Sequence, residues 1–444
     1  MFKYFPHTEA DLAAMRARIG IAADQDMFVD IPASVRMTRD YAIPSALSEV
    51  ELRARLQAIA NENRTMTVFS GLGAYDHYDP AVIHALIARQ EFLTSYTPYQ
   101  PEIAQGTLSY IFEYQSMVTM LTGMEVSNAS MYDGPTAAAE ACFMASAIAR
   151  RNKVLVSAAV HPNIAEVVMT YAHFRGLEVA FVPVADGETS FTDLSALLDE
   201  TVAGVLVQKP NYFGIIESFE GFADAIHNNG SVMIESCDIS TLGVLKTPAE
   251  DGADIACGDC QSLGMPLAFG GPYLGYLATK KPYVRRMPGR IVGQSFDRNG
   301  KRAFVLTLQA REQHIRREKA NSNICSNQSL MALYGTIYLS LMGPEGLKRV
   351  NELSYEKAHK LHDLLVATGK FSPVFDKSFL KEFVLHTSLD QARIQEALAE
   401  AGFFGAVSLA DYDEAYRDVV NFAVTEKRTD AEIERFAAVL GGLR

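Results

Sequence analysis

The sequence predicts an α/β fold with a mostly parallel sheet, followed by a second, smaller α+β domain. Short β-branched runs alternate with helical stretches from residue 124 to about 279, a pattern typical of a parallel sheet covered by helices on both faces. After Pro344-Glu345-Gly346 the order changes to a helix followed by mixed strands and helices. The 444 residues, 48% hydrophobic and 21% charged, describe a globular chain long enough for two or three domains.

The elements fall into three expected parts: an N-terminal helical arm (1–65), a large α/β domain (66–343) and a small α+β domain (344–444). In the arm, Thr8 and Ser48 are predicted to cap two helices. The large domain has predicted strands at 154–156, 177–184, 202–207 and 232–234, and predicted helices at 135–150, 162–174, 193–199 and 219–229. The small domain has predicted helices at 347–368, 390–401 and 430–440, and predicted strands at 371–375, 382–386 and 418–424.

One segment, Tyr96 to Gly106, combines two tyrosines and two glutamines with two prolines that hold the backbone extended. Thr107 is then expected to cap a helix that ends at Gly123. Such a segment can present polar groups at a pocket or at a subunit interface. It can equally be an ordinary aromatic turn that precedes a core helix.

Composition excludes several classes of partner. The charge sum of 40 Lys and Arg against 53 Asp and Glu is −13, so the chain has no overall charge suited to nucleic acid or to an anionic membrane. No apolar run approaches the length of a membrane span, and the first residues do not resemble a signal peptide. Five scattered cysteines fit a reducing compartment better than a disulfide framework, so we expect a cytoplasmic protein.

The order of an arm, a large α/β domain and a small α+β domain resembles the aminotransferase-like (fold type I) enzymes that depend on pyridoxal phosphate. A closer resemblance, running nearly end to end, is to the glycine decarboxylase (P-protein) of the glycine cleavage system. It matches the first subunit (α, the N-terminal half) of the form that is split into two chains. Four blocks carry this resemblance in the same order: Thr97–Gly106, Asn128–Gly134, Phe269–Gly275 and Arg316–Cys325.

This resemblance implies subunit 1 of a glycine dehydrogenase (aminomethyl-transferring, decarboxylating). The complex decarboxylates glycine with pyridoxal phosphate and passes the aminomethyl group to the lipoyl group of the H-protein. That chemistry needs a lysine to hold the cofactor. The matching stretch Gly258–Pro266 has none, because Gln261 or Ser262 stands in its place. We therefore expect the cofactor on a homologous subunit 2 (β), in a complex that is αβ or α2β2.

A second departure from the family pattern lies at the start of the helix predicted at 135–150. In this fold the cofactor phosphate binds at a helix N-terminus, where free N–H groups and the helix dipole favour anions. Here Asp133 brings a negative charge to that position, and Pro135 lacks an N–H group. The cofactor pocket is thus expected to be disabled. His161 and Asp238 remain as vestiges of groups that stack on the ring and pair with its nitrogen, or as ordinary loop residues.

The site residues expected on this chain are four side chains contributed to a pocket shared with the partner subunit: Tyr96, Tyr99, Gln100 and Gln105. They could orient the glycine carboxylate or line the lipoyl channel. The basic run Arg311, Arg316, Arg317 and Lys319 could contact the partner's cofactor phosphate or the H-protein, or be a solvated helix face.

Two other functions stay open. The chain could be a stand-alone pyridoxal-phosphate decarboxylase or lyase that uses Lys209, which follows a predicted strand near the mouth of the pocket. It could also be a purely structural or regulatory subunit. Cys257 and Cys260 have the spacing of half a zinc or redox site, but without a second pair we expect two small buried residues and no metal.

Overall fold

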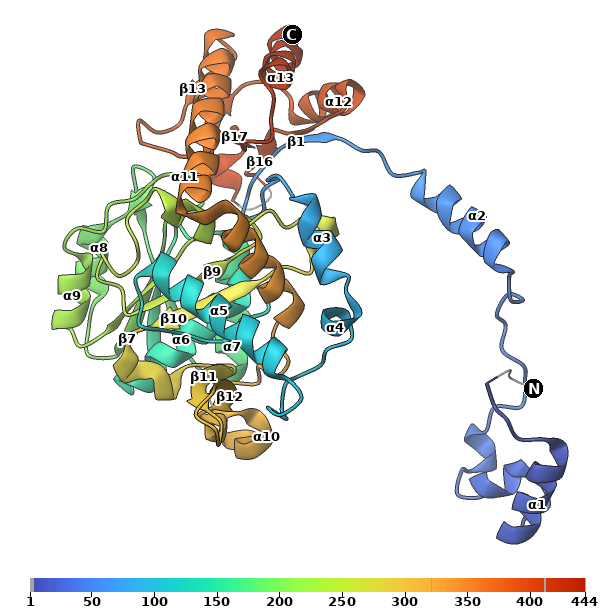
Figure 1. Ribbon diagram of the computed structural model, residues 1–444. Coiled ribbons are helices and arrows are strands. Elements are labelled where there is room, and N and C mark those ends of the chain that lie inside the picture. The colour runs from blue at the N-terminus through green and yellow to red at the C-terminus, as the bar shows by residue number, and fades with distance from the viewer. Residues whose placement is uncertain (1–3, 321, 411–412, 444) are drawn as a thin grey trace. The chain divides into compact units, whose positions relative to one another are not determined.

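The computed structural model describes residues 4–320, 322–410 and 413–443, and these divide into two compact units (Figure 1). Unit 1 is Met1–Arg64 and unit 2 is Thr65–Arg444. Within the described residues, no helix is both long enough and apolar enough to cross a membrane.

Unit 1 contains helices α1 (Glu9–Ile19) and α2 (Glu49–Ala60), which confirms the two predicted helices. Each begins with a reciprocal capping box, in which Thr8 or Ser48 bonds the backbone of the third helical residue and receives that residue's carboxylate in return. Among described residues 4–64 none is buried, and apolar side chains such as Val50 and Leu56 are more than half exposed. Local capping, and not a core of its own, therefore defines these helices.

The centre of unit 2 is a seven-stranded sheet in the order β2-β10-β9-β8-β7-β3-β4. Strands β9, β8, β7, β3 and β4 run parallel, and β10 is antiparallel to both of its neighbours. The mostly parallel sheet predicted from the sequence is thus confirmed. The strands are β2 (Val126–Ser127), β3 (Lys153–Ser157), β4 (Glu178–Val182), β7 (Val202–Gln208), β8 (Val232–Ser236), β9 (Ile255–Asp259) and β10 (Gly275–Thr279).

Helices cover both faces of this sheet, and the strand side chains alternate between them (Figure 1). In β3, Val154 and Val156 belong to the core shared with α6 (Gly134–Ala149) and α7 (Pro162–Arg175). Leu155 packs in the opposite core. That second core includes α5 (Gln105–Thr122), α9 (Phe222–Asn228) and the first part of α11 (Ser329–Ala367); α8 (Phe191–Leu197) lies beside β4.

Helix α5 differs from its prediction at the N-terminus. It begins at Gln105, so Thr107 lies inside the helix and does not cap it. The Thr107 hydroxyl instead bonds Ser95 at 2.9 Å. The predicted stop at Gly123 is confirmed, because this residue adopts a left-handed conformation (φ +71°) that glycine tolerates best.

The C-terminal part of unit 2 is an α+β layer. Strands β13 (Phe371–Pro373), β14 (Glu382–Thr387), β17 (Val419–Ala423) and β16 (Val407–Ser408) form an antiparallel sheet in that order. The second part of α11 packs on it with α12 (Gln391–Ala401) and α13 (Asp430–Gly442). Helix α11 is interrupted at Gly343, just before Pro344, because proline removes a helical N–H and Gly343 leaves the helical region.

Strand β1 (Thr67–Phe69) also joins this C-terminal layer, by parallel pairing with β15 (Phe403–Gly405). Its residues lie in the range predicted for the large domain, yet Phe69 is fully buried in the core of the α+β layer. A strand from the N-terminal end of unit 2 is thus part of the C-terminal α+β layer. The loop that follows β1 is therefore connected to both the main sheet and the α+β layer.

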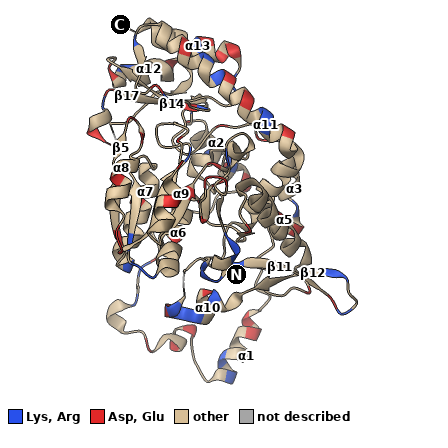
Figure 2. Cartoon of the chain, turned by 90° about the vertical axis from the view of Figure 1, so that its left-hand side faces the viewer, with Lys and Arg blue, Asp and Glu red and all other residues tan. Residues whose placement is uncertain are grey.

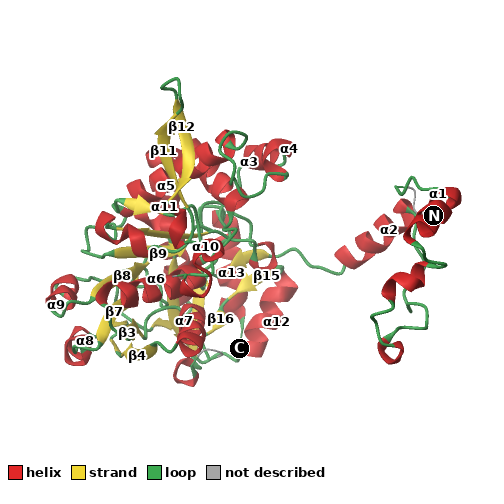
Figure 3. Ribbon diagram, turned by 90° about the horizontal axis from the view of Figure 1, so that it is seen from below, coloured by secondary structure: helices red, strands yellow, loops and turns green. Residues whose placement is uncertain are grey.

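The sequence prediction missed the hairpin of β11 (Ile291–Phe296) and β12 (Arg302–Thr307), which extends from the body of unit 2 (Figure 3). Lys and Arg residues lie at its turn and around α10 (Gln313–Arg316) (Figure 2). Both strands mix polar and apolar residues. The hairpin is held mainly by the backbone hydrogen bonds between its two strands and by contacts with α5.

The aromatic core of the α+β layer can be tested at α13. Phe436 is fully buried and stacks on Phe69 with ring centroids 4.2 Å apart. Phe436→Ala should lower the free energy of unfolding by roughly 3–5 kcal/mol, measured by urea denaturation. The matched control is Phe404→Ala in β15, where the ring is 45% exposed and little change is expected. Equal effects of the two substitutions would contradict this packing.

Candidate functional site

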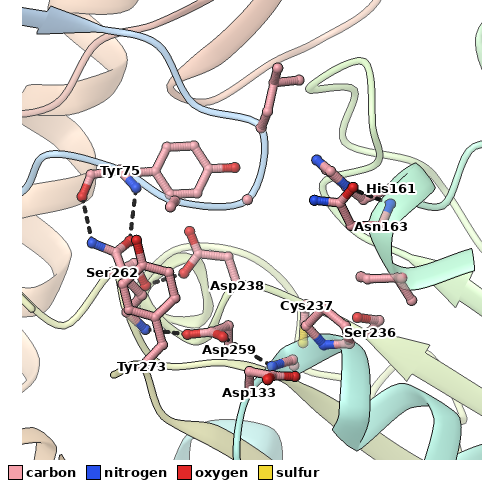
Figure 4. A pocket seen from close by; sticks show the side chains of 18 of the residues that line it. Tyr75, Asp133, His161, Asn163, Ser236, Cys237, Asp238, Asp259, Ser262 and Tyr273 are labelled. Atoms are coloured by element: carbon pink, nitrogen blue, oxygen red, sulfur yellow. Dashed lines mark hydrogen bonds between the residues drawn. The ribbon is translucent and has the colours of Figure 1, made fainter. Parts of the chain in front are cut away.

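A cavity of about 500 Å³ opens where β7, β8 and β9 end, at the edge of the sheet where ligands bind in open α/β folds. Its lining combines these strand ends with the loop after β1, the N-terminal ends of α6 and α7, and the segment entering β14 (Figure 4). Both vestigial candidates, His161 and Asp238, line this cavity. Within the described residues, no cluster of His, Cys, Asp and Glu could hold a metal ion.

The central interaction of the cavity is an ion pair between Asp238 and Lys381. Asp238 follows β8, and Lys381 immediately precedes β14 of the α+β layer. The Lys381 ammonium lies 2.6 Å from Asp238 Oδ2 and 4.0 Å from the centre of the Tyr75 ring. Burial, the largest single effect, would raise the pKa of Asp238, but the charge and hydrogen bond of the ammonium, together with Ser262 and His77, outweigh burial and the pKa of Asp238 is lowered. Ser262 donates a further hydrogen bond to the same carboxylate.

A histidine extends this pair toward the C-terminal end of β17. His77 Nε2 lies 2.9 Å from the Lys381 ammonium, which can only donate, so Nε2 must accept. The ring proton therefore belongs on Nδ1, which lies 2.6 Å from Glu426. The pKa of Glu426 is lowered to about 2, because the neighbouring His77 and two backbone N–H groups outweigh its burial. The two layers of unit 2 thus meet through a continuous polar chain.

The N-terminus of α6, the expected phosphate position, is occupied by two carboxylates of the chain itself. Asp133 caps the helix by accepting from Thr136 N–H at 2.8 Å. Asp259, at the end of β9, accepts from Gly134 N–H at 2.9 Å and from Gln261 N–H at 2.7 Å. Burial, with smaller contributions from Asp133 and Asp238, raises the pKa of Asp259 to about 7. A bound phosphate would meet the negative charge of Asp133 and N–H groups that are already bonded to Asp133 and Asp259.

The positions that replace the cofactor lysine are used in structural contacts. Gln261 accepts from Tyr75 N–H at 2.8 Å and donates to the carbonyls of Tyr75 and Met265. Ser262 bonds Asp238. Neither a carboxamide nor a hydroxyl can form an imine with the cofactor aldehyde. The pyridine partner, the phosphate position and the lysine position are therefore all altered, and the residues of this cavity do not fit pyridoxal phosphate.

His161 caps α7, and its Nδ1 accepts from Asn163 N–H at 3.1 Å. Its own backbone N–H donates to Gln208, the last residue of β7. Burial lowers the pKa of His161 to about 4, so the ring is neutral in the physiological range. These contacts give His161 a structural function at the cavity wall, beside the loop that follows β1.

The structure places the four residues of the 96–106 segment away from this cavity. Tyr96 and Gln100 are exposed, and Tyr99 is 46% exposed with its hydroxyl 2.9 Å from Arg290. Gln105 differs, because its amide bonds both the N–H and the carbonyl of Phe304 in β12 and so anchors the hairpin. Tyr96, Tyr99 and Gln100 thus lie at the surface of unit 2.

Lys209 does not reach the cavity, contrary to its expected place near the pocket mouth. It is only 3% exposed, forms an ion pair with Asp251 and lies 3.4 Å from Glu235. The reason is strand geometry: Gln208 at the end of β7 faces the cavity, and the next side chain points to the opposite face. Cys257 and Cys260 are both fully buried, as predicted.

The seven-stranded sheet, the α+β layer and the altered cavity define the chain as a protein of the fold type I class of pyridoxal-phosphate enzymes. Its fold is shared with the glutamate decarboxylase of Lactobacillus brevis, with a TM-score of 0.68 at 11% identity over 92% of this chain and 95% of the other.

The particular family follows from closer comparisons. The model of the glycine cleavage system P-protein family matches residues 2–440, and the chain belongs to this family. It is 48% identical, over 99% of both chains, to a probable glycine dehydrogenase (decarboxylating) subunit 1 of Moorella thermoacetica. The crystal structure of a glycine decarboxylase (P-protein) in inhibitor-bound form superimposes with a TM-score of 0.92 at 43% identity, covering 99% of each chain.

Sequence reasoning missed Lys381 as a residue of the cavity. It lies 143 residues from Asp238, and no local motif marks it. One signal was present: Lys381 and Glu382 stand together just before the apolar run Phe383–Leu385, and both are buried. Adjacent charges entering a buried strand need partners, which here are Asp238 for Lys381 and the segment 72–75 for Glu382.

The ion pair can be tested by removing one partner. Lys381→Met leaves the Asp238 carboxylate buried without its cation, and should lower the free energy of unfolding by roughly 3–5 kcal/mol in urea denaturation. Lys381→Met combined with Asp238→Asn should recover most of this loss. The control is Lys377→Met, which removes a partly exposed pair with Glu188 and should have little effect. A double variant as unstable as the single one would count against the pair.

The buried proton of Asp259 makes stability depend on pH. The folded state keeps the proton up to a pH of about 7, whereas an unfolded Asp loses it near its model value of 3.8. This contribution is therefore fully present below the unfolded pKa and is lost as pH rises through about 7. Urea midpoints at pH 5 and pH 8 should differ less in Asp259→Asn than in the wild type. The exposed control Asp224→Asn should behave like the wild type.

Proposed function

We propose that this chain is subunit 1 of a two-subunit glycine dehydrogenase (decarboxylating) and is the half that does not carry the cofactor. The observation that carries this proposal is the combination of a full-length match to such subunits with a cavity that does not fit pyridoxal phosphate. A homologous subunit 2 would hold pyridoxal phosphate and the cofactor lysine. The substrates of the complex would be glycine and the lipoylated H-protein.

In this assembly the chain contributes surface residues to a site shared with subunit 2. Tyr96, Tyr99 and Gln100 are exposed polar or aromatic groups on a segment that α5 and the β11–β12 hairpin support. Side chains on such a rigid base can orient a ligand without moving themselves. Five free cysteines, four of them buried, support a reducing compartment such as the cytoplasm.

A purely structural subunit is the second candidate, and Gln105 favours it, because its amide is fully engaged with backbone groups of this chain. A stand-alone enzyme that uses Lys209 receives no support, since that side chain is paired and faces away from the cavity.

The position of the cofactor can be tested directly. The purified chain, alone and with subunit 2, is incubated with pyridoxal phosphate, reduced with borohydride and analysed by mass spectrometry. We expect no trapped lysine on this chain and a stoichiometric adduct on subunit 2. An adduct on Lys209 or Lys381 would show that this chain is a pyridoxal enzyme in its own right.

The contribution of the 96–106 segment is tested in the assembled complex. Tyr99→Phe and Gln100→Ala should each lower glycine turnover by about tenfold while the two subunits still co-elute in gel filtration. Ile103→Ala, at a residue 83% exposed on the same segment, is the control and should leave turnover unchanged. If both polar variants keep wild-type turnover, the purely structural function is the correct one.

A further inference from the structure

A buried arginine lies where three of the four sequence blocks meet. Arg290 precedes β11 and is 2% exposed. From the first block, the Tyr99 hydroxyl lies 2.9 Å from its Nη2. From the second, Ala129 N–H donates to its carbonyl at 2.8 Å. From the fourth, Cys325 Sγ lies 3.7 Å from the same Nη2.

The hydrogen-bonding capacity of Arg290 is not used up within the described residues. A guanidinium has five N–H donors, and a buried one is normally matched by carboxylates or carbonyls. Among the described residues, Nε has no hydrogen-bond partner, and the Glu312 carboxylate lies 3.5 Å from it. Oε1 of Glu312 likewise has no hydrogen-bond partner among the residues that the structure describes. The shortest contact of the Arg290 guanidinium is thus the 2.9 Å hydrogen bond to the Tyr99 hydroxyl and not a contact with a carboxylate.

This contact decides what the Tyr99 hydroxyl can do. Since its oxygen accepts from Arg290, its own proton is free to point elsewhere, and Tyr99 is half-exposed. The guanidinium also lies 5.2 Å from the centre of the ring, and the His314 ring meets it edge-on at 6.0 Å. The phenol is therefore held on two sides and presented as a hydrogen-bond donor backed by a positive charge.

We infer that Arg290 is a positioning residue that fixes Tyr99 as a donor to an anionic oxygen in the site shared with subunit 2. A donor polarised by a buried cation suits a carboxylate or a phosphate oxygen. The carboxylate of the amino-acid substrate and the phosphate of the partner's cofactor share this chemistry. The inference rests on the proposed function, because it needs a second chain to complete the site.

The test uses the purified complex of both subunits with four variants of this chain: Arg290→Lys, Tyr99→Phe, the two combined, and Arg298→Lys. Arg290→Lys keeps the charge and loses the planar fork that holds the phenol. We expect each single change at 290 or 99 to lower kcat/KM for glycine by about tenfold. Because Arg290 acts through Tyr99, the combined variant should lose no more than either single one. Arg298, exposed at the hairpin turn, is the control and should have no effect.

Two further measurements separate the possible sources of the anionic oxygen. If Tyr99 contacts the substrate carboxylate, KM for glycine rises and the dissociation constant of pyridoxal phosphate, followed by its visible absorption, is unchanged. If Tyr99 contacts the cofactor phosphate, that dissociation constant rises by a similar factor. Either result supports the inference and names the ligand.

Gel filtration and thermal unfolding of each complex check that every variant folds and assembles. Should Arg290→Lys fail to assemble, Arg290→Met with Glu312→Gln removes both buried charges and should show the same loss of kcat/KM. Wild-type kinetics in the assembled 290 variant, or additive losses in the combined variant, would overturn the inference and leave the proposed function standing. A wild-type complex that does not turn over glycine would refute the proposed function, and the inference with it.

Discussion

The ion pair between Lys381 and Asp238 is the interaction on which the organisation of unit 2 depends. It joins a residue after β8 of the main sheet to a residue before β14 of the α+β layer. His77 and Glu426 continue the same polar chain, and Glu382 binds the segment 72–75 that follows β1. Because these charges are buried, each one requires its partner, so the relative position of the two layers within the unit is tightly specified.

The same pair explains how a cofactor fold can persist without fitting its cofactor. In this fold a carboxylate after the corresponding strand pairs with the pyridine nitrogen, and a helix N-terminus binds the phosphate. Here an ammonium of the chain stands beside that carboxylate, and Asp133 and Asp259 satisfy N–H groups of α6. Side chains of this chain thus occupy both positions. The Lys381 ammonium binds the carboxylate that would pair with the pyridine nitrogen, and the carboxyl groups of Asp133 and Asp259 bind the N–H groups that would bind the phosphate. The cavity walls keep their shape because their polar groups are still satisfied.

In the proposed assembly, the residues that this chain contributes to a shared site have to lie where a second chain can reach them. The segment 96–106 meets this condition, since Tyr96 and Gln100 are exposed while Gln105 is anchored to β12. Arg290 couples the segment to the blocks at 128–134 and 316–325. Residues that are far apart in the sequence, Tyr99, Ala129 and Cys325, are thus held together by contacts with one buried arginine.

The sequence by itself determined the alternating strands and helices, the capping of α1 and α2, the family, and the absence of a lysine at 261–262. These features are local, since they depend on hydrophobic period, capping chemistry and short motifs. Only the tertiary structure decided that Lys381 reaches Asp238, that Lys209 faces away from the cavity, and that Gln105 bonds β12. These outcomes depend on pairings across 143, 42 and 199 residues and on which face of a strand each side chain takes. Residue spacing along the chain does not encode such long-range contacts, because packing of the whole sheet selects them.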